Sequence, residues 1–269
     1  PIDAVLISHT VGDLTQHAAR LVGPNVRFAG WKGFAAGSLG GHTAALSASY
    51  EDRPGVTGTT RYQPDEFLTM ADASLEMGGS VCIHAIGDAA VAHVVDLFSD
   101  LIAAGAPPQR LRVEHASVLT PDLIDRMAQL GVLASVQPAF VQSDARWLDD
   151  RLGPERARWT YPFRSMLEAG VRLLGGSDAP VEHPDPLTGA RAAVHRSGWN
   201  VEEALEPWQG LALFAENSFD DGTATWVSPE LDRFQRLASL SSADAGRCPT
   251  RTRRGVRLPS SSRRGPRRP

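Results

Sequence analysis

The sequence is poor in cysteine. Cys82 and Cys248 are its only two cysteines among 269 residues, the first in a predicted core strand and the second near the C-terminus. Two cysteines so placed cannot form the disulfide framework of a small secreted domain. We therefore expect a reducing compartment, the cytoplasm.

Long hydrophobic runs are also missing. No apolar stretch approaches the roughly 18 residues that a membrane-spanning helix needs, which argues against a membrane partner. Hydrophobic residues still make up 42% of the chain, enough for a sizeable core in one large domain or two small ones.

Lysine occurs once, as Lys32, against 26 arginines. In a chain so biased, arginine fills the ordinary surface positions for cations. The one remaining lysine is then a candidate for chemistry that needs a primary amine, which a guanidinium cannot supply.

Acidic residues are absent from the last part of the chain. Residues 247–269 contain nine arginines and no acid, so the net charge of −4 splits into +9 there and −13 elsewhere. Such a segment is typical of a nucleic-acid or membrane arm, of a disordered tail, or of a reading-frame error in a GC-rich gene. We favour the last two, expect no nucleic-acid partner, and predict that residues 217–269 form a poorly structured tail.

Two apolar stretches that each reach a histidine are the clearest local feature. Residues 81–84 lead to His84 and residues 112–115 lead to His115, with one amphipathic helical pattern between them. A strand, a helix and a second strand in this length predict a βαβ unit with parallel strands. Both histidines should therefore lie at the carboxyl ends of neighbouring strands, where α/β proteins place their chemistry.

The same alternation continues along most of the chain. The patterns predict strands at residues 4–7, 26–34, 132–138 and 171–180, and helices at residues 12–22, 64–78, 121–130, 156–169, 187–195 and 201–214. Repeated crossovers of this kind favour a doubly wound sheet or a (β/α) barrel.

The ends of the predicted strands bring together residues that suit a metal ion. They are Lys32, His84, His115, Gln137 and Asp178. Two imidazoles, a carboxylate and a lysine at one face of a barrel suit a divalent metal such as zinc.

Five short motifs of the sequence resemble motifs of the amidohydrolase superfamily. The resemblance is to its amidohydrolase-3 group in particular, which includes N-substituted formamide deformylase-like proteins. They run in the family's order at residues 32–40, 84–88, 114–116, 161–164 and 176–180. The resemblance covers roughly residues 1–215 and implies an α/β fold, a partial (β/α)₈ TIM-type barrel with about strands three to eight. We expect this barrel to occupy residues 1–216.

The resemblance also implies a site with one or two metal ions. By it, Lys32, His84, His115 and Asp178 are metal ligands, with Lys32 often carboxylated in the family and Asp178 also moving protons. The expected cofactor is a divalent metal, zinc by preference, and the expected substrate a small amide-type molecule. His42 and Arg164 are candidate substrate-binding residues, each with an ordinary structural role as the alternative.

One departure from the family matters. No two histidines are separated by a single residue, so the family's first-strand His-x-His pair has no counterpart. We therefore expect the chain to be the carboxyl-terminal part of a longer hydrolase of non-peptide C–N bonds. The alternative is a catalytically inactive fragment, and a homo-oligomer formed through its open edges is a further expectation.

Overall fold

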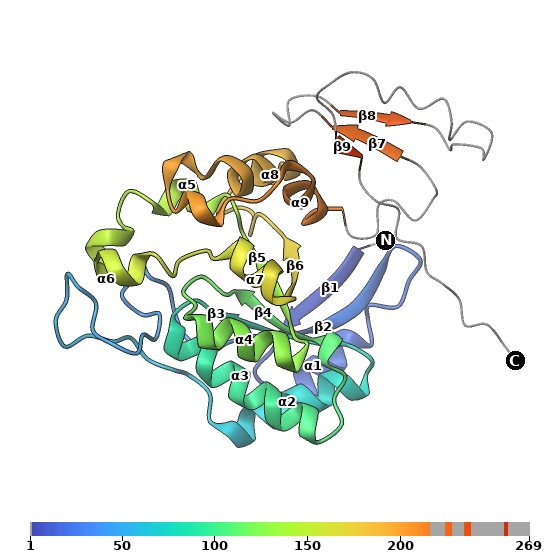
Figure 1. Cartoon of the computed structure of the whole chain (residues 1–269). Coiled ribbons are helices and arrows are strands. Elements are labelled where there is room, and N and C mark those ends of the chain that lie inside the picture. The colour runs from blue at the N-terminus through green and yellow to red at the C-terminus, as the bar shows by residue number, and fades with distance from the viewer. Residues whose placement is uncertain (1, 216–223, 228–233, 238–255, 258–269) are drawn as a thin grey trace, which may run out of the picture.

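A parallel sheet of six strands forms the centre of the molecule. The computed structural model describes residues 2–215, 224–227, 234–237 and 256–257. The strands pair in chain order, all parallel, and are β1 Ile2–Ile7, β2 Val26–Phe34, β3 Ser80–Ala85, β4 Leu111–His115, β5 Leu133–Val136 and β6 Arg172–Gly175 (Figure 1). This confirms the prediction of an α/β fold with six barrel strands.

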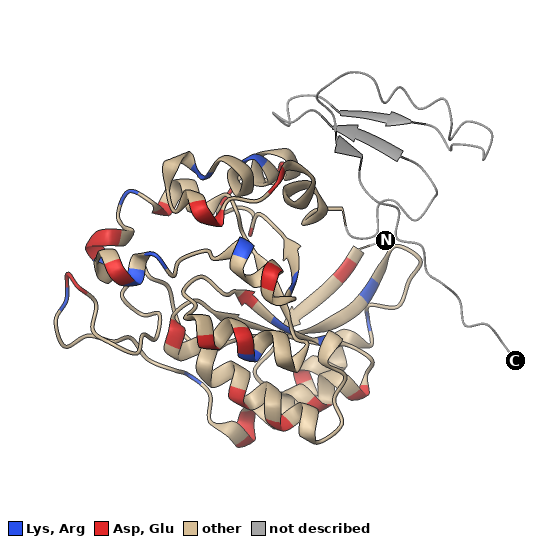
Figure 2. Cartoon of the chain, in the orientation of Figure 1, with Lys and Arg blue, Asp and Glu red and all other residues tan. Residues whose placement is uncertain are grey.

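Helices connect these strands, and the first four lie along one face of the sheet (Figure 1). The α-helices are α1 Val11–Ala18, α2 Pro64–Glu76, α3 Asp88–Ala103, α4 Pro121–Leu130, α5 Phe140–Asp144, α6 Leu148–Ala157, α7 Phe163–Ala169, α8 Pro186–His195 and α9 Pro207–Ala212. Three 3₁₀ turns are η1 Pro108–Arg110, η2 Arg196–Gly198 and η3 Val201–Glu203. Acidic positions recur along the first four helices (Figure 2), as expected for the negative charge of this part of the chain.

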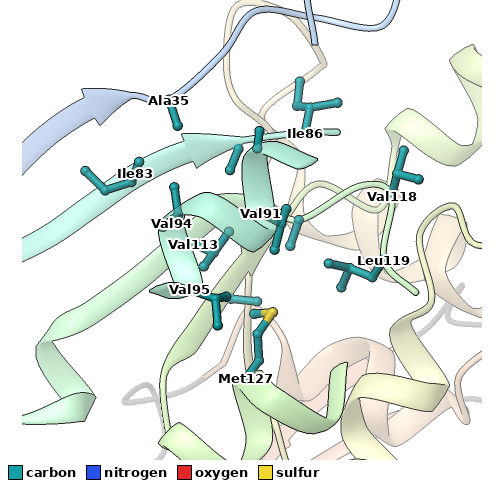
Figure 3. Close-up of a cluster of buried hydrophobic side chains, with 14 of the residues drawn as sticks. Ala35, Ile83, Ile86, Val91, Val94, Val95, Val113, Val118, Leu119 and Met127 are labelled. Atoms are coloured by element: carbon teal, nitrogen blue, oxygen red, sulfur yellow. The ribbon is translucent and has the colours of Figure 1, made fainter. Parts of the chain in front are cut away.

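The core lies between the sheet and these helices. Val91, Val94 and Val95 of α3 are fully buried against Ile83 of β3 and Val113 of β4 (Figure 3). Burying a side chain of this size contributes about 1.5–3 kcal/mol, so the central βαβ unit is a main source of stability.

Local sequence signals set the ends of α4. The hydroxyl of Thr120 accepts a hydrogen bond from the Leu123 amide at 3.4 Å, and Pro121 occupies the first helical position. Gly131 ends the helix with a φ of 70°, a conformation that glycine adopts without steric cost. These local features agree with the helix predicted over residues 121–130.

The helix predicted over residues 156–169 is wrong as a continuous element. The chain instead forms α6 and α7, separated by five residues that include Tyr161 and Pro162. A proline disfavours the helical conformation in the residue before it, and Tyr161 has a φ of 53°. The helix predicted over residues 201–214 is similarly divided into η3 and α9, and α5 was not predicted.

Most of the predicted tail lies outside the described residues. Its described parts are the short strands β7 Ala224–Val227, β8 Phe234–Leu237 and β9 Val256–Arg257, which pair antiparallel in a sheet of their own. No pattern in the sequence predicted these strands, and the boundary at residue 216 stays a prediction.

No helix in the described part of the chain is both long enough and apolar enough to cross a membrane.

Candidate metal centre and the adjoining pocket

Strand register places several polar side chains on the inner face of the incomplete barrel. Lys32 pairs with Cys82, and Phe34 pairs with His84, which pairs in turn with Glu114. Side chains at paired positions of parallel strands point to the same face. The alternate residues of these strands are buried against the helices, so the polar ones line the inside.

His115 breaks this alternation. It pairs with Ala85, whose side chain lies on the helix face, so a regular strand would direct His115 there as well. Its φ of 72° turns the chain instead, and its ring meets that of His84 edge to face with 4.5 Å between centroids. A residue other than glycine in this conformation costs about 1–3 kcal/mol, and such strain gathers at functional sites.

Hydrogen bonds fix the tautomers of both rings. The Nδ1–H of His115 donates to Oε1 of Gln137 at 2.7 Å, because an amide oxygen can only accept. The Nε2–H of His84 donates to the carbonyl of Gly37 at 3.0 Å for the same reason. Each ring therefore keeps one nitrogen lone pair, Nε2 on His115 and Nδ1 on His84, for another ligand.

Burial keeps both imidazoles neutral. Burial, together with the nearby His84 and Lys32, lowers the pKa of His115 to about 3, against the opposing effect of the hydrogen bond with Gln137. Burial and the charge of Lys32 lower the pKa of His84 as well, against the opposing effects of the Gly37 carbonyl and Asp178. Neutral imidazole is the form that binds metal ions.

Lys32 and Asp178 lie near this pair. Burial lowers the pKa of the Lys32 amine, while the charges of Glu114, Cys82 and Asp178 oppose that change. Asp178 follows β6 in an exposed loop with a φ of 54° and acts electrostatically on both Lys32 and His84. The structure thus gathers the four predicted ligands in one region.

The complete ligand set is not assembled in the described residues. Among them, no three or more His, Cys, Asp or Glu side chains approach closely enough to hold a metal ion together. The structure therefore supplies a pair of imidazole donors, with Lys32 and Asp178 near enough to act on His84 electrostatically.

His42 and Arg164 contact other protein groups. Nε2 of His42 lies 3.0 Å from Oδ1 of Asp52 and 2.6 Å from a guanidinium nitrogen of Arg151, which joins the loop after β2 to α6. Arg164 donates two hydrogen bonds, of 2.9 and 2.6 Å, to the carbonyl of Ala204. Their role in substrate binding stays a prediction, and these contacts favour the structural alternative for both.

A pocket of about 220 Å³ adjoins the histidine pair. The segments that follow β2, β3, β4, β5 and β6 all contribute to its lining, which consists of Ser38, Leu39, Gly40, Ile86, Ser117, Phe140, Ser143, Asp144, Trp147, Tyr161, Val181 and Glu182. The ring of Phe140 stacks on that of His115, with 6.2 Å between centroids and 12° between planes. The sequence did not predict this pocket. Five of its lining residues nevertheless lie within the five motifs described above: Ser38, Leu39, Gly40, Ile86 and Tyr161.

Comparison with known proteins gives three consistent matches. The sequence model of the amidohydrolase family matches residues 3–255. The putative amidohydrolase YtcJ of Bacillus subtilis is 34% identical over 225 residues, which are 80% of this chain and 42% of that protein. N-substituted formamide deformylase of Arthrobacter pascens is 28% identical over 166 residues, 60% of this chain and 31% of that protein.

A solved structure matches the fold. The crystal structure of an uncharacterized metal-dependent hydrolase from Pyrococcus horikoshii superposes with a TM-score of 0.71 at 32% identity, over 82% of this chain and 46% of that one. The chain therefore spans less than half the length of these relatives.

Proposed function

The chain belongs to the amidohydrolase family, and from this we propose that it forms the carboxyl-terminal part of a metal-dependent hydrolase that cleaves non-peptide C–N bonds in small amides or formamides. Similarity to the uncharacterized metal-dependent hydrolase of P. horikoshii supports metal-dependent hydrolysis, and similarity to the formamide deformylase of A. pascens supports the C–N bond as the one cleaved. The activity of the whole protein is part of the proposal, because the chain covers 42% of its B. subtilis relative.

The observation that carries the proposal is the histidine pair. Both rings donate one N–H to a carbonyl-type oxygen and keep the other nitrogen free, at adjacent strand ends with 4.5 Å between ring centroids. An acceptor that orients the ring from behind is the usual companion of a metal-binding histidine. The donor types therefore fit a divalent metal, and zinc is the ion we propose.

We assign four residues of this chain to the metal: Lys32, His84, His115 and Asp178. A bound divalent metal lowers the pKa of water to about 7 and polarises a carbonyl group. Asp178 is exposed beside this site. Its carboxylate is suited to accept the proton of the attacking water and to return it to the leaving nitrogen.

A second candidate is an inactive fragment that binds metal weakly through the histidine pair. It is favoured by the absence of a His-x-His pair from the sequence and by the incomplete ligand set of the described residues. The coding sequence upstream of Pro1 separates the two candidates, because the family resemblance places that pair on the first strand.

Metal removal tests the proposed function. In the complete protein that contains this chain, a chelator should abolish hydrolysis of N-substituted formamides and amides, and added zinc should restore it. Circular dichroism before and after chelation separates loss of metal from loss of fold. Full turnover by a folded protein shown to be free of metal would contradict the proposal.

Replacing Gln137 with alanine tests the orientation of His115. The change removes the acceptor of the Nδ1–H bond, so the affinity for zinc should fall about 10- to 100-fold. Competition with a chromogenic chelator measures the zinc affinity of each variant. Gln142, exposed on α5, provides the control, and equal affinities for Gln137→Ala and Gln142→Ala would show that His115 needs no such support.

A further inference from the structure

The pocket beside the histidine pair has an apolar wall with three aromatic rings. Phe140, Trp147 and Tyr161 contribute the rings, next to aliphatic side chains from the loops after β2, β3 and β6. Its volume of about 220 Å³ is below the range of about 300–1,000 Å³ for ordinary ligand sites, so its occupant is small. Phe140 stacks on His115, which places the pocket directly next to the site of bond cleavage proposed above.

Two carboxylates face this wall. Asp144, partly buried at the end of α5, and Glu182, in the loop after β6, are the charged residues of the lining, which includes no Lys, Arg or His from the described part of the chain. Burial raises the pKa of Asp144, and so does the charge of Glu182, while hydrogen bonds from Tyr161 and Ser143 and the charge of Arg146 act in the opposite direction. The charges that the lining itself contributes in the described part of the chain are therefore both negative.

Neighbouring contacts hold the Asp144 side of the pocket in place. The hydroxyl of Tyr161 donates to Oδ2 of Asp144 at 2.5 Å. Arg196, fully buried, donates to the backbone carbonyl of Tyr161 at 3.0 Å and lies over the ring of Phe163. A carboxylate accepts several hydrogen bonds, so Asp144 keeps acceptor capacity toward the pocket.

Aromatic faces combined with carboxylates are the surroundings that favour an organic cation. We propose that this pocket binds a protonated amino group on a small aromatic or aliphatic body, so that the hydrolase acts on amides that also carry an ammonium group. The assignment of the amide to the cleaved bond rests on the proposed function, whereas the preference for a cation rests on the pocket alone. A neutral occupant would fill the apolar wall but bring no positive charge to the two carboxylates, and an anion would be repelled by them.

Binding of three matched probes to the complete protein tests this proposal. The probes are 2-phenylethylammonium, its neutral analogue 2-phenylethanol and the anion 3-phenylpropanoate, titrated calorimetrically into chelator-treated protein. We expect the ammonium to bind about 10- to 100-fold more tightly than the alcohol, as for a charge-assisted hydrogen bond in a partly buried site. The anion should bind more weakly than either.

Two substitutions test whether the preference for the ammonium over the alcohol arises in the pocket. Asp144→Asn and Glu182→Gln should each lower the affinity for the ammonium several-fold and leave the affinity for the alcohol unchanged. Glu182 lies in a loop, so its variant does not depend on repacking of the buried Tyr161. Asp149→Asn, an exposed acid in the first turn of α6 outside the lining, is the matched control and should change neither affinity.

The outcomes separate this inference from the proposed function. Equal binding of ammonium and alcohol, or an ammonium preference that survives both substitutions, would overturn the cation pocket even if neutral amides are hydrolysed. Preferential ammonium binding that both substitutions reduce would establish the pocket, even in a protein that hydrolyses no amide.

Discussion

Replacing His115 with alanine should lower the rate of amide hydrolysis by the complete protein more than about 100-fold, the upper end for residues that only orient a metal ligand. The change removes a proposed ligand whose Nδ1–H is bonded to Gln137, which leaves the Nε2 lone pair for a metal ion. It does not relieve the left-handed backbone at this position, because alanine also carries a Cβ and disfavours a φ of 72°. Steady-state kinetics with a formamide substrate and metal content by atomic emission measure both effects.

His93 provides the matched control. It lies in the middle of α3, partly buried, with its Nε2 at 3.3 Å from the carbonyl of Tyr62. His93→Ala should therefore keep nearly full activity and metal content. If both variants lose activity to the same degree while metal stays bound, the loss reflects stability and His115 is not a ligand.

Residues 1–269 expressed alone should not behave as a monodisperse monomer. The described sheet is open, since β1 and β6 each pair on one side, and Ile2 and Ile7 of β1 are 64% and 61% exposed. Unpaired strand edges and uncovered apolar faces promote association. Several hundred Å² of such surface at about 25 cal/mol per Å² corresponds to about 10 kcal/mol, comparable with the whole stability of a domain.

Light scattering after size-exclusion chromatography measures the oligomeric state of residues 1–269, which we expect to be a dimer or a larger species. Ile2→Lys, which places a charge on the open edge, should shift the population toward monomer. Val201→Lys, at an apolar residue that is 59% exposed and outside the sheet, should not. A monodisperse wild-type monomer with a sharp thermal transition and zinc-dependent turnover would contradict this prediction. It would show that the open edge lowers the stability by far less than about 10 kcal/mol.

The sequence by itself determined the succession of strands and α-helices from β1 to β5. The alternation of apolar runs with amphipathic segments is local, and so are the signals at Thr120, Pro121 and Gly131 that bound α4. Local signals of this kind are readable because neighbouring residues produce them. The strand-end positions of Lys32, His84 and His115 followed in the same way, since parallel crossovers bring strand ends to one edge.

Only the tertiary structure decided how those residues meet. The alternation of a strand directs His115 away from His84, and the left-handed turn that reverses it has no signal in the residue types. Gln137 gained its role as hydrogen-bond acceptor, and Asp144 its place beside Tyr161, through contacts between segments far apart in the chain. Such contacts depend on how separate loops pack above one sheet edge, which no local pattern encodes.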